Sequence, residues 1–221
     1  MILTPIPRHQ LDYALGRFAA GLHDSAAHRV FEKIRATSPD RAFGEAAERH
    51  RLAALIFARD CGMAVHPAGS ECRFNWDGVA LNGDTEAYVI LHEIAHFVLA
   101  PRERRCLIDF GLGPGPDTLD RDAAAQAAML TPLARAADET AASLLGILWE
   151  ARLGQPALAS FLDQNWLEGL DRSAPTHFTA VLGELQRRGL LALDPRSALP
   201  IRSRSPDLPG KSAAARGRAT D

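Results

Sequence analysis

The feature that most constrains the fold of this chain is the segment YVILHEIAHFVLAP, from Tyr88 to Pro101. Two histidines and a glutamate interrupt a run that is otherwise almost wholly apolar. The apolar residues leave no polar stripe for solvent, so the pattern predicts an internal helix over 85–100. Thr85 or Asp84 can cap its start, and Pro101 ends it. Because such a helix belongs in the interior, its three polar side chains need partners there.

The polar residues of this helix form the pattern H-E-x-x-H. His92 and His96 lie one turn apart on one helix face, so both imidazoles can reach a single metal ion, and Glu93 can address the open position of that ion. The competing interpretation is a core helix whose histidines find backbone partners. A metal ion explains better why the polar groups are buried together. We therefore predict a divalent metal site that holds zinc or iron, with Glu93 as the catalytic residue.

H-E-x-x-H supplies two ligands, and a stable site needs at least one more from elsewhere in the chain. We predict Glu139, which lies two turns into a second helix expected over 132–154. The residues one and two turns further on are small and let this face approach the metal helix closely. Glu139 can instead belong to a solvated acidic pair near a helix start. The other carboxylates considered as the third ligand are Asp138, Asp122 and Asp120.

The rest of the chain predicts an α+β, mostly helical domain over 1–194. Helical spacing of apolar residues runs through 8–62, and short apolar pieces between Gly, Pro, Asn and Asp over 63–83 predict two or three short strands or a hairpin. Two more amphipathic helices follow the second ligand helix, and His177 in the last of them is expected to have no catalytic role. Residues 195–221, rich in Arg, Ser, Pro and Gly, are expected to form a disordered tail.

Composition mainly excludes classes of partner. A net charge of −2 gives no bulk attraction to nucleic acid or to a membrane. The cysteines, Cys61, Cys72 and Cys106, have the spacing of neither a disulfide framework nor a zinc finger, which fits a reducing cytoplasm. The chain start lacks the apolar run of a signal peptide, and the buried helix is too short and too polar to span a bilayer. We therefore expect a cytoplasmic protein.

A longer pattern continues past the two histidines. It comprises HEI-x-H, Ala100, the pair Arg104 and Arg105, Leu107, the run Asp109, Phe110 and Gly111, and the pair Pro116 and Asp117. Over this stretch, from His92 to Asp117, the chain resembles the bacterial elongation factor P hydroxylase family, in register and without a gap. The resemblance extends more loosely to the helix of Glu139. It implies a zincin-like metal centre at His92, His96 and a downstream acidic residue, beside a small sheet or hairpin at the cleft edge. It also implies that the substrate is a modified lysine of elongation factor P.

Three functions remain open at this point. The first is the hydroxylase of the resemblance, the second is the zinc metallopeptidase that H-E-x-x-H alone implies, and the third is a non-enzymatic helical module with a structural metal site. Two histidines and one carboxylate suit both hydrolysis with zinc and oxygen chemistry with iron. In hydrolysis Glu93 takes a proton from the attacking water, and in oxidation it donates a proton or positions the substrate.

Residues just beyond the metal helix are candidates for supporting roles. Asp109 can accept a hydrogen bond from the second nitrogen of a ligand histidine, or it can cap the glycine-rich turn that follows; we favour the first. Arg104 and Arg105 can receive an acidic surface of a protein substrate, although a charged run past a helix end is usually only solvated.

Overall fold

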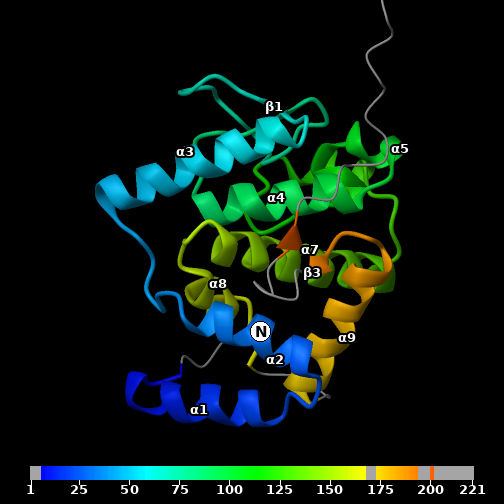
Figure 1. The fold of residues 1–221 in the computed structure, drawn as a ribbon. Coiled ribbons are helices and arrows are strands. Elements are labelled where there is room, and N and C mark those ends of the chain that lie inside the picture. Colours follow the sequence, from blue (N-terminus) through cyan, green and yellow to red (C-terminus); the bar gives the residue numbers. More distant parts are fainter. Residues whose placement is uncertain (1–5, 168–172, 194–199, 202–221) are drawn as a thin grey trace, which may run out of the picture.

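The computed structural model describes residues 6–167, 173–193 and 200–201 (Figure 1). Within these residues the protein is mostly helical with two pairs of short strands, which confirms the predicted α+β, mostly helical class. The elements in chain order are α1 (Arg8–Ala20), α2 (Ser25–Arg35), α3 (Gly44–Asp60), β1 (Ala64–Val65), β2 (Ala80–Leu81), α4 (Ala87–Leu99), α5 (Arg102–Arg105), the 3-10 turn η1 (Ile108–Gly111), α6 (Arg121–Gln126), α7 (Pro132–Arg152), α8 (Ala157–Asp163), α9 (Ala174–Arg187), β3 (Ala192–Leu193) and β4 (Pro200–Ile201).

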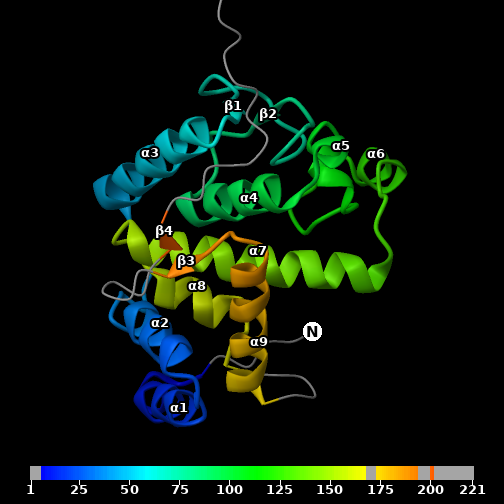
Figure 2. The same ribbon diagram turned by 45° about the vertical axis from the view of Figure 1, so that its right-hand side comes forward.

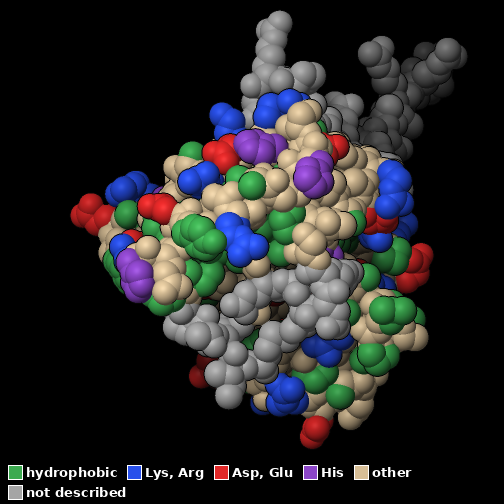
Figure 3. All heavy atoms as spheres, turned by 90° about the horizontal axis from the view of Figure 1, so that it is seen from below, with side chains coloured by type: hydrophobic (Ala, Val, Ile, Leu, Met, Phe, Trp, Pro, Cys, Tyr) green, Lys and Arg blue, Asp and Glu red, His purple; other side chains and the backbone are tan. Residues whose placement is uncertain are grey.

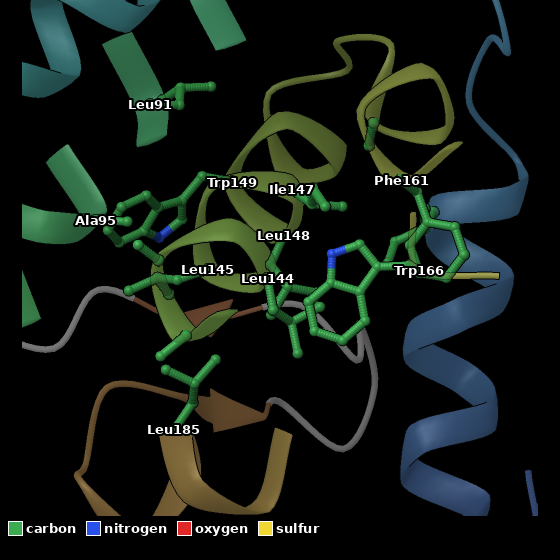
Figure 4. Packing of buried hydrophobic residues seen from close by; sticks show 14 of the residues in the cluster. Leu91, Ala95, Leu144, Leu145, Ile147, Leu148, Trp149, Phe161, Trp166 and Leu185 are labelled. Carbon is green, nitrogen blue, oxygen red and sulfur yellow. The ribbon is translucent and has the colours of Figure 1, made fainter. Parts of the chain in front are cut away.

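Helices α4 and α7 form the centre of the molecule and pack along each other (Figures 1 and 2). Helix α3 packs on α4, while α8 and α9 pack on α7, and α1 and α2 lie at the end opposite to α3. Figure 4 shows Leu91 and Ala95 of α4 facing Trp149 of α7. One cluster of buried hydrophobic side chains runs from α1 to Leu191. The predicted metal helix is therefore internal.

The two central helices begin in different ways. Thr131 caps α7, its hydroxyl accepting from the amide of Ala134, and Pro132 occupies the first turn as predicted. Helix α4 begins after Glu86 without a side-chain cap, so the predicted cap at Thr85 or Asp84 is wrong. The carboxylate of Asp84 instead accepts a hydrogen bond from a backbone amide of the preceding loop.

Strands β1 and β2 lie within the predicted strand region 63–83, but they pair in parallel and do not form a hairpin. The segment between them is long enough to return the chain to the same end of the pair. Strands β3 and β4 pair antiparallel, so the prediction of disorder from 195 onward is wrong at Pro200–Ile201; the rest of that segment lies outside the described residues. No described helix combines the length and the apolar character that a membrane span needs.

Charges of both signs are distributed over the surface. On the face shown in Figure 3, Lys and Arg side chains are interspersed with Asp, Glu and hydrophobic ones. The visible described part of this face therefore presents no continuous surface of one charge, which agrees with the small net charge of the chain.

A buried carboxylate lies between α7 and α8. Glu150 is 2% exposed, the hydroxyl of Ser160 lies 2.6 and 2.7 Å from its two oxygens, and the guanidinium of Arg41 is 3.9 Å away. Burial raises the pKa of Glu150 to about 7, although Ser160 and Arg41 oppose the shift. Folded protein therefore keeps a proton on Glu150 at a pH at which an unfolded chain has lost it.

We expect this group to make the protein less stable as pH rises. The stabilisation from the bound proton is fully present below the ordinary pKa of 4.5 and is lost as pH rises to about 7. From 4.5 to about 7 the pKa rises by about 2.5, so at about 1.4 kcal/mol per pKa unit the loss is about 3.5 kcal/mol. Glu150→Gln is uncharged at every pH and does not lose this stabilisation. The difference between its unfolding free energy, measured in urea, and that of wild type should therefore shift in favour of the variant from about pH 5 to about pH 8. A constant difference between the two proteins would contradict the burial of an ionisable Glu150.

Candidate metal centre

Three side chains from two helices converge near the middle of the molecule. His92 and His96 lie one turn apart on α4, and Glu139 faces them from α7. The Nε2 atoms of the histidines are 3.0 Å apart, and Oε2 of Glu139 lies 3.4 Å from the first and 3.3 Å from the second. Ligand atoms bound at about 2.0–2.1 Å in a tetrahedron are about 3.3 Å from one another. The three atoms therefore have the spacing that fits one zinc-sized ion.

Close packing of α7 on α4 brings Glu139 to the histidines. A Cβ atom added at Gly146 would lie 3.4 Å from both the Cα and the amide nitrogen of His92, so a larger side chain would push the helices apart. Ala142, one turn earlier, is completely buried. The close approach predicted from the small residues of α7 is therefore observed.

The second nitrogen of His96 is held by Asp138. Nδ1 of His96 lies 3.0 Å from Oδ1 of Asp138, whose other oxygen accepts a hydrogen bond of 2.9 Å from Nη2 of Arg104. These side chains are 3%, 10% and 9% exposed respectively. When Nδ1 donates to Asp138, the neutral ring turns the lone pair of Nε2 toward Glu139, which is the orientation of a metal ligand.

Asp109 does not have the predicted role. Its carboxylate accepts a hydrogen bond of 2.8 Å from the hydroxyl of Thr118, while Asp138 occupies the expected position beside His96. Asp138 directly precedes Glu139 on α7, so the helix that brings Glu139 to the histidines also brings Asp138 to His96. Asp109 and Phe110 have φ angles of 44° and 54°, which residues with side chains rarely adopt. This turn buries the ring of Phe110 completely, 5.7 Å from that of His96.

The two arginines after the metal helix also differ from the prediction of a partner surface. Arg104 is 7% exposed, because the short helix α5 turns it inward against Asp138. Arg105 donates a hydrogen bond of 2.9 Å from Nε to the carbonyl of Ala100 and lies over the ring of Phe97. Both side chains therefore stabilise the end of α4 and the site beneath it.

The carboxylates determine the protonation of the histidines. Burial alone would lower the pKa of His96, but Asp138 and Glu139 raise it to about 10. Burial lowers the pKa of His92, and its effect exceeds that of Glu139. Burial would raise the pKa of Glu139, but both histidines hold it well below its usual range. The two carboxylates that raise the pKa of His96 would also favour a divalent cation, which would have to displace this proton in order to bind.

Glu93 lies beside these ligands without being one of them. It is 9% exposed, and the amide nitrogen of Asn75 lies 3.5 Å from its Oε1. Burial is the main cause that raises the pKa of Glu93 to about 7, which suits a group that accepts and returns a proton near neutral pH.

The histidines, Glu93 and Glu139 line a cavity of about 690 Å³. Part of its wall comes from residues far along the chain: the ring of His177 stacks on that of Trp166, with centroids 5.5 Å apart, and both line the cavity. His177 was expected to have no catalytic role, because nothing near it in the sequence supports one, and the structure places its ring at the wall of this cavity. Among the described residues no strand residue lines this cavity; the strand region reaches its edge through Asn75, whose carbonyl accepts a hydrogen bond from the amide of Asn82 beside β2.

The remaining candidates for the third ligand lie outside the cavity lining. Asp120 caps α6 by accepting from the amide of Ala123, and it also pairs with Arg73 at 3.2 Å. Asp122 is exposed in the first turn of α6. Among the described residues, Glu139 is the carboxylate that completes the cluster with the two histidines.

We expect Asp138→Asn to weaken metal binding by about 10–100-fold, the usual effect of removing the partner of a ligand histidine. The amide of Asn keeps the shape of the carboxylate but carries no negative charge. It no longer neutralises the charge of Arg104 or accepts a charge-assisted hydrogen bond from His96. Competition with a chromophoric chelator measures the affinity, and circular dichroism checks that the variant is folded. Asp122→Asn is the matched control and should bind as wild type does. Equal affinities for the two variants would contradict the role of Asp138.

Comparisons with models of protein families, with curated proteins and with solved structures found no match. The function is therefore inferred from the site and from the motif around it.

Proposed function

We propose that this protein is a metal-dependent enzyme that hydroxylates a modified lysine of elongation factor P. The proposal of a bound metal rests on the spacing of three atoms, Nε2 of His92, Nε2 of His96 and Oε2 of Glu139, which lie 3.0, 3.3 and 3.4 Å from one another. The buried carboxylate of Glu93 lies beside them. The choice of reaction rests on the resemblance to the hydroxylase family over His92 to Asp117. A zincin-like arrangement and a cytoplasmic location are part of the same proposal.

The residues that carry the resemblance also surround the site, which supports its functional meaning. Asp109, Phe110, Pro116 and Asp117 line the cavity beside the histidines. Arg104 holds the carboxylate that orients His96.

Each group has a distinct part in the proposed reaction. His92, His96 and Glu139 would hold the ion; iron would supply the oxygen activation that hydroxylation needs, whereas zinc would supply the Lewis acidity of the hydrolytic alternative. Hydroxylation places one oxygen atom of O2 in a C–H bond and reduces the other to water, so it also needs two electrons from a reductant outside this chain. Glu93 would hold a proton at its carboxyl beside the ion and deliver it to the oxygen that leaves as water. Apolar side chains of the wall enclose the aliphatic part of a lysine and exclude water; they are Val89, Phe110, Leu112 and Trp166.

The two alternatives have less support. A peptidase of this kind would profit from a strand edge that binds the extended substrate backbone, but β1 and β2 are two residues each, and neither lines the cavity. A structural metal site is closed by its ligands. Here the ligand atoms face a cavity, so a substrate can approach them.

Intact-mass spectrometry of elongation factor P tests the proposal. The factor purified from the source strain should be one oxygen atom heavier than the factor from a strain that lacks this protein, and it should not be cut. Equal masses in a strain that does modify the lysine would exclude this substrate. Cleavage of a peptide that Glu93→Gln abolishes would reassign the protein as a metallopeptidase.

A further inference from the structure

A second cavity of about 890 Å³ adjoins the metal cavity at the start of α4. The two cavities share three lining residues, Asn75, Tyr88 and Asp117. Asn75 also contacts Glu93, so the shared wall reaches the carboxylate beside the metal ligands. The two cavities are therefore neighbours, separated by these three side chains.

The lining of the second cavity is acidic. Its arginines are each paired with a carboxylate: Arg41 with Asp163 at 2.8 Å, Arg51 with Glu48 at 2.7 Å, and Arg73 with Asp120 at 3.2 Å. Glu86 and Asp117 have no ion-pair partner among the described residues. Apart from the buried Glu150, which keeps its proton to about pH 7, the lining carboxylates outnumber the three lining arginines five to three; they are Glu48, Asp84, Glu86, Asp117 and Asp163.

Apolar side chains are exposed in the lining of the same cavity. Phe43 and Leu119 are 82% and 76% exposed, although both are large and apolar. The guanidinium of Arg41 lies 3.8 Å above the ring of Tyr88 in the lining. A small cation would leave these apolar surfaces in water, whereas a polypeptide covers them while it presents charged side chains to the carboxylates.

We propose that this second cavity is the docking groove for a lysine- or arginine-rich segment of the protein substrate. Glu86 and Asp117 receive its cationic side chains at the entrance to the metal cavity, and Phe43 and Leu119 contact its apolar parts. The inference rests on the proposed function, because it takes the substrate to be a protein. The negative lining disfavours acidic peptides and nucleic acid through charge repulsion.

Fluorescence anisotropy with two labelled peptides of equal length tests the groove. One peptide has Lys at every second position and the other has Glu there, and the remaining positions are Ala or Gly in both. The lysine peptide should bind more tightly as salt is lowered, and the glutamate peptide should not bind. Glu86→Gln and Asp117→Asn should each weaken binding about threefold, and the double variant about tenfold. The control with the same charge change, Asp12→Asn/Glu103→Gln, alters exposed carboxylates outside the lining and should bind as wild type does.

Alkylation with iodoacetamide locates the bound peptide. Cys72 lines the groove, whereas exposed Cys106 does not. The lysine peptide should slow modification of Cys72 and leave that of Cys106 unchanged in the same sample, as read by peptide mapping. Equal affinity for both peptides, equal weakening by the control variant, or binding without protection of Cys72 would each overturn the inference.

These measurements need neither bound metal nor turnover, so they separate the two proposals. A metal-binding protein that hydroxylates its substrate yet does not bind the lysine peptide would exclude the groove and retain the proposed function. A protein that binds the peptide in the groove but holds no metal would exclude the proposed function.

Discussion

Glu93→Gln is expected to lower the turnover of the lysine substrate by about 10²–10⁴-fold, the usual contribution of proton transfer by a positioned side chain. An amide keeps the shape of the carboxylate but cannot accept a proton. The variant should keep its metal, because the ligand atoms belong to His92, His96 and Glu139. Rates with saturating substrate, together with the metal content of the same samples, measure both effects.

The same chemical change on the exposed Glu103 of α5 is the matched control, and Glu103→Gln should turn over as wild type does. Full turnover by Glu93→Gln would place the proton transfer elsewhere, and Asp109 in the same cavity would be tested next. Loss of metal from Glu93→Gln would make Glu93 a ligand and contradict the assignment.

Glu139→Ala is expected to weaken metal binding more strongly than Asp138→Asn, for which the expected loss is about 10–100-fold. Glu139→Ala removes a metal ligand, whereas Asp138→Asn changes only a residue that holds a ligand histidine. His92→Ala/His96→Ala should abolish binding, since one carboxylate alone remains. Elemental analysis of untagged protein loaded with Zn²⁺, or with Fe²⁺ under anaerobic conditions, should find about one ion per chain in wild type only.

Asp122→Ala removes an exposed carboxylate outside the cavity lining and serves as the control for these losses. If Glu139→Ala binds metal as tightly as wild type, the third ligand lies elsewhere. If wild type and the double histidine variant both contain almost no metal after loading, the site holds no ion and the proposed function fails.

The metal helix and its two histidines could be predicted because their geometry is local. The spacing H-E-x-x-H fixes both imidazoles on one face of any helix, and the apolar residues around them predict burial. Glu139 could be proposed for a related reason: Gly146 and its small neighbours indicate the face of α7 that packs closely. These inferences need only helical periodicity and residue size.

The residues that support the ligands could not be assigned because tertiary packing selects them. Asp138 is 42 residues from His96 and 34 from Arg104, and both Asp138 and Asp109 were chemically suitable partners for a histidine. The inward turn of Arg104 depends on α5, where the sequence indicated only a charged run. The parallel pairing of β1 and β2 likewise depends on how the intervening loop folds back, which strand propensity does not specify.

Anomalous diffraction from crystals of the zinc-loaded protein, recorded on both sides of the zinc absorption edge, shows whether an ion binds at these three side chains. We expect one strong peak between α4 and α7, about 2.0–2.2 Å from Nε2 of His92, Nε2 of His96 and an oxygen of Glu139. Glu93 should lie near that peak without coordinating it. A peak at any other group of side chains, or no peak between these helices at full zinc loading, would contradict the account.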